Sequence, residues 1–558
     1  MTDHAEYTHA LKKRARHAPL GLSAVAVLVA AICLLPMMAV AIAAFSGGTG
    51  TVSQLLASVL PRYVGNTALL VVLVSIGTLC LGVGAAWLVT ITRFPGVRLF
   101  EIALVLPLAF PSYVLAYAYT YILDHPGIVQ STLRDVMGWG PRDYWFPEVR
   151  SLGGAAFMLV LVLYPYVYLL ARASFLQQSG TTFLAARALG SSAWSAFFRV
   201  SLPLARPAIA GGVLLAVMET IADFGTVAYF GVQTFATGIY TSWFTLADRG
   251  GAAQLALCLL SFALLLAMLE RIQRGRAKYS DAARGGQEKT QLQLHGVHAF
   301  AAFALCSIPV LLGCVLPVVV LFNMGLGSEQ DLLSSRYLAF IQNSLTLAGI
   351  AAVVTVCAAV TVGFFQRMQP GRFSSSTAYI ARLGYAVPGG VVAVGLLVPF
   401  AAFDNALDAW MRSTFDISTG LLVTGSIWLL IIAYLVRFSA AALGAYEGGQ
   451  ALVHANMDAA SRSLGQTPWG TLRRVHLPIL TPSLLTALLI VFVDVMKELP
   501  ATLIMRPFNY DTLAVQAYRL ASDERLEGAA VPSLVIVAMG LLPVILICRQ
   551  VGRGKSGA

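Results

Sequence analysis

Twelve long apolar stretches constrain the fold of this chain more than any other feature. A membrane-spanning helix needs about 20 predominantly apolar residues, and stretches of that length recur from one end of the sequence to the other. Because 58% of the 558 residues are apolar and only 11% are charged, a soluble globular protein is excluded. The predicted fold class is therefore an all-α polytopic membrane protein. Its expected spans lie near 20–45, 66–90, 101–122, 152–173, 207–229, 251–270, 298–323, 341–365, 379–402, 419–440, 482–505 and 528–549.

The first apolar stretch follows four basic residues between positions 12 and 16, so a signal peptide is an alternative interpretation. The apolar core of a signal peptide has about 7–15 residues. The run from Leu20 to Phe45 has 26 residues. We therefore expect a retained membrane anchor.

Basic residues alternate between the two ends of the expected spans. The linker 271–297 has six basic residues and two acidic ones, and segments 92–100, 172–206 and 366–378 have basic residues and no acids. The intervening segments 122–151 and 402–418 are rich in aspartate. Because Lys and Arg are retained on the cytoplasmic side, we expect the linker and both termini to be cytoplasmic. The net charge of +11 lies in loops that flank the membrane, so nucleic acid is not an expected partner.

One polar pattern occurs twice, 275 residues apart. It reads ARALGSSAWSAFFRVSLPLARP around Arg187 and SRSLGQTPWGTLRRVHLPILTP around Arg462. Nine of 21 positions are identical: Arg187/Arg462, Leu189/Leu464, Gly190/Gly465, Trp194/Trp469, Arg199/Arg474, Val200/Val475, Leu202/Leu477, Pro203/Pro478 and Pro207/Pro482. Apolar spans resemble one another by composition alone, but polar loops do not, so this repeat indicates a duplicated function.

The duplication extends into the spans. Asn66-Thr67 corresponds to Asn343-Ser344, and Pro111 corresponds to Pro388, in each case 277 residues apart. We therefore divide the chain into a first half (1–270), a cytoplasmic linker (271–297) and a second half (298–558). Six spans are an even number, so the halves have the same orientation and form a parallel repeat with a pathway between them.

The repeated segment predicts two short helices joined by a tight turn. Gly190 can adopt the left-handed conformation that ends a helix. Ser191 or Ser192 can cap the next helix, and Thr467 precedes a first-turn proline in the same role. We expect Leu-Pro at Pro203 and Pro478 to end that second helix. Trp194 and Trp469 then suit insertion into a pocket of a soluble partner. The alternative is a helix that rests on lipid headgroups.

The spacing A-A-x-x-x-G, followed by about a dozen residues and Leu-Pro, resembles the coupling loop of binding-protein-dependent ABC importer permeases. The resemblance implies a type I ABC importer permease fold with two pseudo-twofold parallel repeats of six helices. It places the coupling loops at 181–206 and 456–481, where they would contact the ATPase subunits. The sequence departs from the family pattern at the usual glutamate, where Leu184 and Ala459 stand, with Asp458 one residue early. The residues that would contact the ATPase are Ala185, Ala186, Gly190, Trp194, Leu202, Pro203, Ala460, Gly465, Trp469, Leu477 and Pro478.

Two further stretches, 219–244 and 493–526, look like the fused two-half permeases of ferric-iron importers. That resemblance implies a permease that moves ferric iron, bare or chelated, across the bacterial inner membrane. It implies a periplasmic iron-binding protein and two copies of an ABC ATPase as partners, with ATP and Mg on the ATPase and no cofactor on this chain. Thiamine and polyamine permeases share the loop and the fold and remain alternatives. A secondary transporter driven by an ion gradient is the rival class.

Acidic pairs lie inside two spans. Glu219 and Asp223 correspond to Asp494 and Glu498 at the offset of 275, and Lys497 lies beside the second pair. Charges in spans are costly and usually mark function, and each pair shares one helix face. A break follows at Gly225 and at Pro500, where backbone groups can line a cavity. Four carboxylates suit transient binding of a hard cation along a translocation path. The alternative is a structural polar cluster in which Lys497 pairs with Asp494 or Asp223.

Tyr113, Tyr117 and Tyr121 follow Pro107 and Pro111 at four-residue spacing. Phenolate oxygen is a good ferric ligand, so Tyr113 and Tyr117 join the candidate path. An aromatic belt at the membrane surface is the alternative.

No nucleotide site of the chain's own is expected. Gly554-Lys555-Ser556 resembles the end of a phosphate-binding loop, but Arg549 stands where its first glycine belongs and no helix follows. No cysteine pair has metal-ligand spacing. We therefore expect a transport subunit that is not itself an enzyme.

Overall fold

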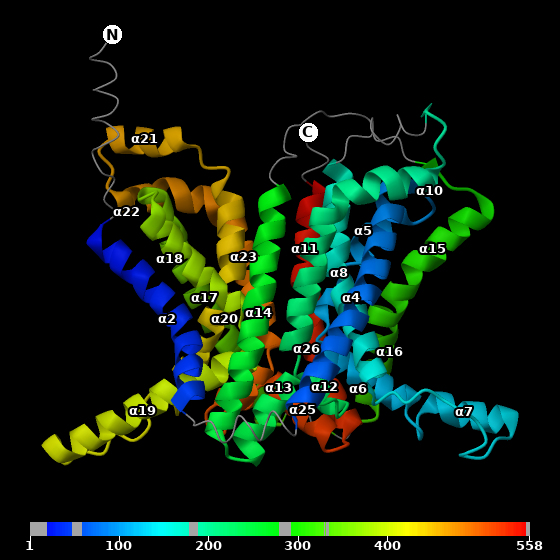
Figure 1. The fold of residues 1–558 in the computed structure, drawn as a ribbon, viewed down its shortest axis with the longest axis horizontal. Helices are drawn as coiled ribbons and strands as arrows, with labels where there is room; N and C mark the ends of the chain where they lie inside the picture. The colour runs from blue at the N-terminus through cyan, green and yellow to red at the C-terminus, as the bar shows by residue number, and fades with distance from the viewer. Residues whose placement is uncertain are drawn as a thin grey trace, which may run out of the picture. The chain divides into compact units, whose positions relative to one another are not determined.

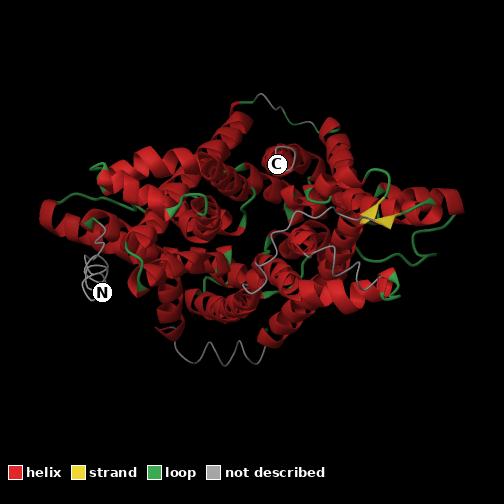
Figure 2. Cartoon of the chain, turned by 90° about the horizontal axis from the view of Figure 1, so that it is seen from above, coloured by secondary structure: helices red, strands yellow, loops and turns green. Residues whose placement is uncertain are grey.

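A computed structural model describes residues 19–46, 59–177, 188–277, 292–328, 330 and 334–553. These residues are almost entirely helical (Figures 1 and 2), apart from a parallel pair of two-residue strands, β1 (Thr92–Arg93) and β2 (Leu292–Gln293). Within the described ranges, eleven helices are long and apolar enough to cross a membrane, and a bent helix pair supplies a twelfth span. The predicted all-α polytopic fold is confirmed.

The described residues pack into two compact units that do not coincide with the sequence halves. Unit 1 contains those up to Ala39, Leu345–Val387 and Gly395–Val495. Unit 2 contains those of Val40–Ser344, Pro388–Val394 and Met496–Ala558. The N-terminal helix therefore packs with helices of the second half, and the C-terminal helices pack with the first half. The division of the chain at 271–297 remains a prediction, and 278–291 lies outside the described residues.

Unit 2 is built on a core of three long helices. Its elements are α4 (Leu60–Ile91), α5 (Val97–Ala103), η1 (Leu106–Ala109), α6 (Ser112–Leu123), α7 (Ile128–Met137), α8 (Leu152–Gln177), α10 (Ala193–Ala196), η2 (Phe197–Ser201), α11 (Leu202–Ala222), α12 (Gly225–Tyr229), α13 (Phe235–Tyr240), η3 (Thr241–Thr245), α14 (Arg249–Ala277), α15 (Gly296–Val310), η5 (Leu311–Val315), α16 (Leu316–Leu326), α24 (Pro500–Met505), α25 (Leu513–Ser522) and α26 (Leu526–Arg553).

Glycines set the close packing of α4, α8 and α11 in that core. A Cβ atom added at Gly82 on α4 would lie 2.7 Å from the Cβ of Val167 on α8. A Cβ at Gly212 on α11 would lie 2.7 Å from the Cα of the same Val167. Small residues let membrane helices approach in this way, and here they fix the position of α11, which carries Glu219 and ends directly before Asp223.

Unit 1 contains the second repeat of the polar segment. Its elements are α2 (Leu20–Ser46), α17 (Ser335–Met368), α18 (Arg372–Leu383), η6 (Gly384–Ala386), α19 (Gly389–Phe415), α20 (Ile427–Gln450), α21 (Ala455–Ser463), α22 (Pro468–Thr471), η7 (Leu472–His476) and α23 (Leu477–Met496). The chain crosses between the units within α2, α17, α19 and α23. A Cβ at Gly395 would lie 2.4 Å from the carbonyl oxygen of Pro36, so α2 contacts α19 closely.

The predicted third span, 101–122, is not a single helix. Val97–Ala109 and Ser112–Met137 meet at a bend of 92°, with Phe110 and Pro111 between them. Proline at 111 lacks the N–H that would continue the first helix. Pro388 precedes α19 in the same way, which agrees with the expected repeat.

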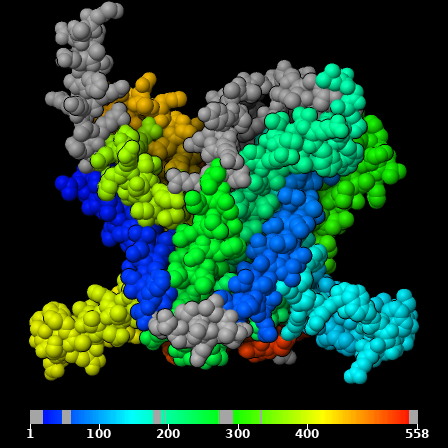
Figure 3. Space-filling view, viewed as in Figure 1, coloured from blue at the N-terminus to red at the C-terminus, as the bar shows by residue number. Residues whose placement is uncertain are grey.

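Helix α7 projects sideways from the end of α6 (Figures 1 and 3). Its polar side chains are held by the chain: Gln130 donates to the carbonyl of Leu123 at 2.8 Å and Arg134 donates to the Tyr144 hydroxyl at 2.8 Å. Its apolar residues Ile128 and Val136 are exposed. This division of faces is typical of a helix that lies in the membrane interface.

Candidate functional site

The second acid of the first pair caps the helix that follows the break. The Asp223 carboxylate accepts hydrogen bonds from the backbone N–H of Thr226 at 3.1 Å and of Val227 at 3.3 Å, at the start of α12. It also accepts from the hydroxyls of Ser112 at 2.5 Å and Thr226 at 3.2 Å. A carboxylate at a helix N-terminus satisfies unpaired N–H groups and the helix dipole. Asp223 therefore joins α6, α11 and α12.

The second acid of the second pair has the same role. Glu498 is buried and accepts from the backbone N–H of Ala501 at 2.9 Å and of Thr502 at 3.0 Å, at the start of α24. The Thr502 hydroxyl donates to it at 2.6 Å. Residues three and four positions after the acid are the donors in both halves. The duplicated Asp223 and Glu498 thus stabilise the two breaks, which the sequence correctly placed at Gly225 and Pro500.

The first acids, Glu219 and Asp494, lie one turn earlier and are half-buried. Glu219 belongs to unit 2 and Asp494 to unit 1. Among the described residues, no group of three or more His, Cys, Asp or Glu is arranged to hold a metal ion. The backbone carbonyl of Lys497 accepts a hydrogen bond from the Tyr113 hydroxyl at 3.4 Å.

Tyr113 and Tyr117 do not form an aromatic belt. They are 4% and 0% exposed, and their ring centroids lie 5.7 Å apart. Tyr117 also packs edge-on against Tyr229 at 4.8 Å. The belt interpretation is wrong for these two residues because the bend at Pro111 turns α6 into the unit.

The two breaks approach each other within unit 2. A Cβ added at Gly225 would lie 2.8 Å from the Cβ of Tyr113 and 3.0 Å from Cδ2 of Leu499. Only glycine therefore permits this contact between α12 and the segment before α24.

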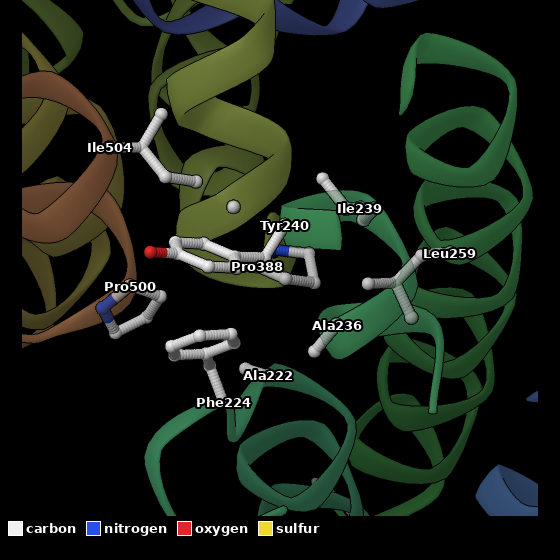
Figure 4. Close-up of a pocket in the computed structure, with 10 residues that line it drawn as sticks. Ala222, Phe224, Ala236, Ile239, Tyr240, Leu259, Pro388, Pro500 and Ile504 are labelled. Atoms are coloured by element: carbon white, nitrogen blue, oxygen red, sulfur yellow. The ribbon is translucent and has the colours of Figure 1, made fainter. Parts of the chain in front are cut away.

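An aromatic plug, formed by Phe224, Tyr240 and Tyr518, lies beside this contact. The Phe224 ring lies 4.9 Å from that of Tyr240 and 5.8 Å from that of Tyr518. Figure 4 shows Phe224 and Tyr240 beside Pro388 and Pro500, around a cavity of about 10 Å³, which has space for about one water molecule. The cavity is lined by Ala222, Phe224, Ala236, Ile239, Tyr240, Leu259, Pro388, Gly390, Pro500 and Ile504. Residues of both halves thus close this region.

Arg150 joins the two halves at a second place in unit 2. Its guanidinium makes a bidentate pair with Glu524 at 2.6 and 2.8 Å and lies 3.2 Å from Asp124. Its Cζ also lies 5.3 Å from the centre of the Tyr229 ring. The hydrogen bonds from Arg150 hold the pKa of Glu524 below its usual value.

A duplicated asparagine holds the chain that follows each break, a role that the sequence analysis missed. Asn66 donates to the carbonyl of Gln233 at 2.8 Å, and Asn343 donates to the carbonyl of Asp511 at 3.1 Å. Each acceptor directly precedes a threonine at the N-cap of the next helix, α13 or α25. The signal was present as a polar pair repeated 277 residues apart, but a single sequence does not show which carbonyl each amide meets.

The repeated polar segments form the expected turn. Gly190 and Gly465 have φ of 86° and 76°. The hydroxyl of Ser192 accepts from the N–H of Ser195 at 3.1 Å, and that of Thr467 accepts from Gly470 at 3.1 Å. Both predicted caps are confirmed. Ala185, Ala186 and Arg187 lie outside the described residues.

The expectation that Leu-Pro ends the second helix is wrong. The helix continues from Trp194 to Ala222 in the first segment and from Pro468 to Met496 in the second, 29 residues in each case. A π-helical turn, η2 or η7, precedes each Leu-Pro, and the N–H groups of Leu202 and Leu477 bond to carbonyls five residues earlier. Widening the turn accommodates the missing N–H of Pro203 and Pro478 without ending the helix.

Large apolar side chains are exposed at both turns. Trp194 and Trp469 are 63% and 68% exposed, and the adjacent Leu189 and Leu464 are exposed too. One face of Trp194 stacks on Trp87 of α4 at 5.5 Å. Ala460 and Pro478 are also exposed, whereas Leu202, Pro203 and Leu477 are half-buried.

Comparison with known proteins identifies the family. The model of the binding-protein-dependent transport system inner membrane component matches residues 78–279 and 356–553. A Fe(3+)-transport system permease protein, FbpB 2 of Haemophilus influenzae, is 27% identical over 95% of this chain and 98% of its own length. The ferric transport system permease protein FbpB of Actinobacillus pleuropneumoniae is 24% identical over 78% of this chain and 63% of its own length.

A third relative carries a different name. The putative 2-aminoethylphosphonate transport system permease protein PhnV of Salmonella typhimurium is 27% identical over 37% of this chain and 72% of its own length. The two family matches cover both sequence halves, including residues of both polar repeats. The chain therefore belongs to the family of inner membrane components of binding-protein-dependent transport systems, as a fused permease that contains the family domain twice.

Proposed function

We propose that this chain is the permease subunit of an ATP-driven importer that moves ferric iron, bare or chelated, into the cytoplasm. A periplasmic iron-binding protein would deliver the cargo. Two copies of a separate ATPase would bind ATP and Mg and dock on the two coupling loops. The names of two relatives that align with most of this chain, both ferric transport permeases, support the choice of ferric iron. The charge pattern supports cytoplasmic termini, linker and coupling loops.

One observation carries the mechanism. In each half a single 29-residue helix runs from the exposed tryptophan of the coupling loop to the break inside the membrane. At 1.5 Å per residue it is about 43 Å long. Movement of the ATPase at one end of a continuous helix is therefore delivered directly to the break at the other.

The aromatic plug is the closed gate in this mechanism. Phe224 lies in the break that follows α11, and Pro500 lies directly after the break that follows α23. Both sides of the gate are therefore attached to helices that the ATPase moves. Gly225 lets these surfaces meet at van der Waals distance. Closure of the ATPase would separate them, and cargo would then enter from the periplasmic side.

The candidate path residues divide by whether they cap the helices that follow the breaks. Asp223 and Glu498 are engaged with helix N-termini, so they act in the gate and not as cargo ligands. Glu219 and Asp494 are the acids that we assign to the translocation path, together with Lys497. Tyr113 and Tyr117 pack against the first break and support the gate.

The docking surfaces are the exposed residues of each turn. Leu189 and Trp194 form the first surface, with Gly190, Leu202 and Pro203 around it, and Ala185 and Ala186, outside the described residues, remain predicted contacts of the same loop. Leu464 and Trp469 form the second, with Ala460, Gly465, Leu477 and Pro478. Because a single exposed tryptophan at each docking point presents a large apolar area, it is the expected anchor.

Uptake by the reconstituted complex tests the proposal. The permease, its ATPase and its binding protein are placed in vesicles, and uptake of ferric citrate, thiamine, spermidine and 2-aminoethylphosphonate is compared with and without ATP. We expect ATP-dependent uptake of iron alone. Uptake of another solute would replace the cargo assignment, and uptake without ATP or ATPase would establish a secondary transporter instead.

A further inference from the structure

A largely buried polar cluster in unit 1, with His476 buried and Asp458 and Arg367 half-buried, fixes α21, the first helix of the second coupling loop. The Asp458 carboxylate lies 2.8 Å from Nε of Arg367 on α17 and 2.7 Å from Nε2 of His476 in η7. Arg367 also donates to the carbonyl of Val453 at 2.7 Å, just before α21. One carboxylate therefore joins three separate elements.

The cluster is shielded from water. The His476 side chain is 0% exposed, and those of Asp458 and Arg367 are 16% and 18% exposed. Phe364 packs edge-on against the His476 ring at 5.2 Å. Although burial raises the pKa of Asp458, the hydrogen bonds from His476 and Arg367 outweigh it and lower the pKa. Charged groups paired in such surroundings are held firmly, because the loss of one partner leaves the other buried and unpaired.

A second polar contact holds the same helix. The hydroxyls of Ser461 on α21 and Thr471 on α22 are 2.8 Å apart and both side chains are buried. Together with Asp458, this contact fixes α21 at two points, which prevents it from rotating about either one.

The first half lacks these groups. At the corresponding positions it has Phe183 for Asp458, Ser201 for His476 and Thr90 for Arg367. Ala186 and Ala196 replace Ser461 and Thr471. None of the first-half residues is charged, so the same brace cannot form there.

We propose that Asp458 is a positioning residue that braces the second coupling helix against α17 and η7 and makes the second coupling loop a rigid lever. The brace transmits ATPase movement into α23 and does not itself contact the ATPase. This inference rests on the proposed docking of the ATPase at the coupling loops. It also explains why the acid of this loop stands one residue before the position of the family's usual glutamate: at position 458 the carboxylate faces into the unit.

Hydrogen exchange of the intact permease in nanodiscs, without ATPase, tests the brace. We expect Asp458→Asn to increase exchange of the 455–463 amides about tenfold or more, because local opening no longer breaks a buried ion pair. Ser461→Ala should have a smaller effect in the same direction. The matched control is Ser463→Ala, because the exposed Ser463 hydroxyl donates to the carbonyl of Ala460 in its own helix. Unchanged exchange in Asp458→Asn would refute the brace.

Transport by the complete complex tests transmission. Asp458→Asn should still bind the ATPase, while the amount of solute imported per ATP hydrolysed falls about tenfold, as expected when a positioning contact is lost. If a variant with faster amide exchange in α21 still imports as much solute per ATP hydrolysed as the wild type, the positioning role is overturned. If Asp458→Asn does not fold, Ser461→Ala with Thr471→Val makes the same test. Failure of the wild-type permease to bind any ATPase would refute the proposed function and leave the exchange result intact.

Discussion

Replacement of Gly225 by alanine tests the closed gate at its closest contact. The new Cβ would lie 2.8 Å from both Cβ and Cδ1 of Tyr113 and 3.0 Å from Cδ2 of Leu499. Overpacking of this kind costs about 1–3 kcal/mol. Because the Cβ of Tyr113 cannot move by a change of rotamer, we take the upper half of that range.

The higher helix propensity of alanine stabilises the closed and the open state alike and cancels between them. The penalty on the closed gate relative to the open one is then about 2–3 kcal/mol. At about 1.4 kcal/mol per factor of ten, the closed state loses about 25–150-fold relative to the open state. The overpacking penalty does not apply to the open state, because its two breaks are no longer in contact.

The assay is basal ATP hydrolysis by the permease–ATPase complex in nanodiscs, without binding protein. We expect Gly225→Ala to raise the basal rate, since the complex reaches the open state more often. Gly211→Ala on α11, the helix before the break, is the control, because its Cβ would meet only Cδ1 of Leu170, at 3.7 Å. Equal basal rates in Gly225→Ala and Gly211→Ala would refute the reasoning.

Four other predictions concern the docking surfaces, the acids inside the spans and the Arg150–Glu524 pair. Trp194→Asp with Trp469→Asp should abolish co-purification of the ATPase, whereas Trp145→Asp, at a tryptophan exposed in the loop before α8, should not; retained co-purification contradicts docking at the turns. Glu219→Gln with Asp494→Asn should lower ferric uptake about tenfold with normal assembly, since charges inside spans usually mark function; normal uptake by this double variant rejects the acidic path. Asp223→Asn should instead lower the free energy of unfolding by about 1–3 kcal/mol, because the helix caps are lost. The Arg150–Glu524 pair should stabilise unit 2 by less than about 1 kcal/mol because it is largely exposed. Since folding lowers the Glu524 pKa, this contribution is present above the usual carboxyl pKa and is lost as the pH falls through the lowered value. The prediction is contradicted if the melting temperature of Glu524→Gln declines in acid as much as that of the wild type.

Local features of the site could be predicted from the sequence because they depend on neighbouring residues. The turn at Gly190 and Gly465, the caps at Ser192 and Thr467, and the breaks at Gly225 and Pro500 all follow from local backbone chemistry. The repeat made each prediction stronger, because the same feature had to hold twice.

The Leu-Pro prediction was wrong for a local reason as well. Proline usually ends a helix, but the widened turn before Pro203 and Pro478 accommodates the missing N–H and lets the helix continue. A π-helical turn has no clear sequence signature, so the 29-residue helices were predicted as shorter spans.

Tertiary contacts were beyond the sequence. The packing of α2 with helices of the second half depends on which apolar faces meet, and apolar spans have similar compositions. An aromatic belt remained the alternative for Tyr113 and Tyr117, because spacing alone does not reveal the bend that buries them. Asp223 and Glu498 were grouped with the path acids because a single sequence does not separate a cap from a cargo ligand.

The distance across the gate during ATP hydrolysis tests the central claim most directly. Spin labels at Ala222→Cys and Ile504→Cys, in a permease without its native cysteines, report on two residues that line the same small cavity. Trapping the ATPase in its closed state with ADP and vanadate should lengthen this distance in the intact complex and leave it unchanged with Trp194→Asp and Trp469→Asp. An unchanged distance in the intact, trapped complex would contradict the account.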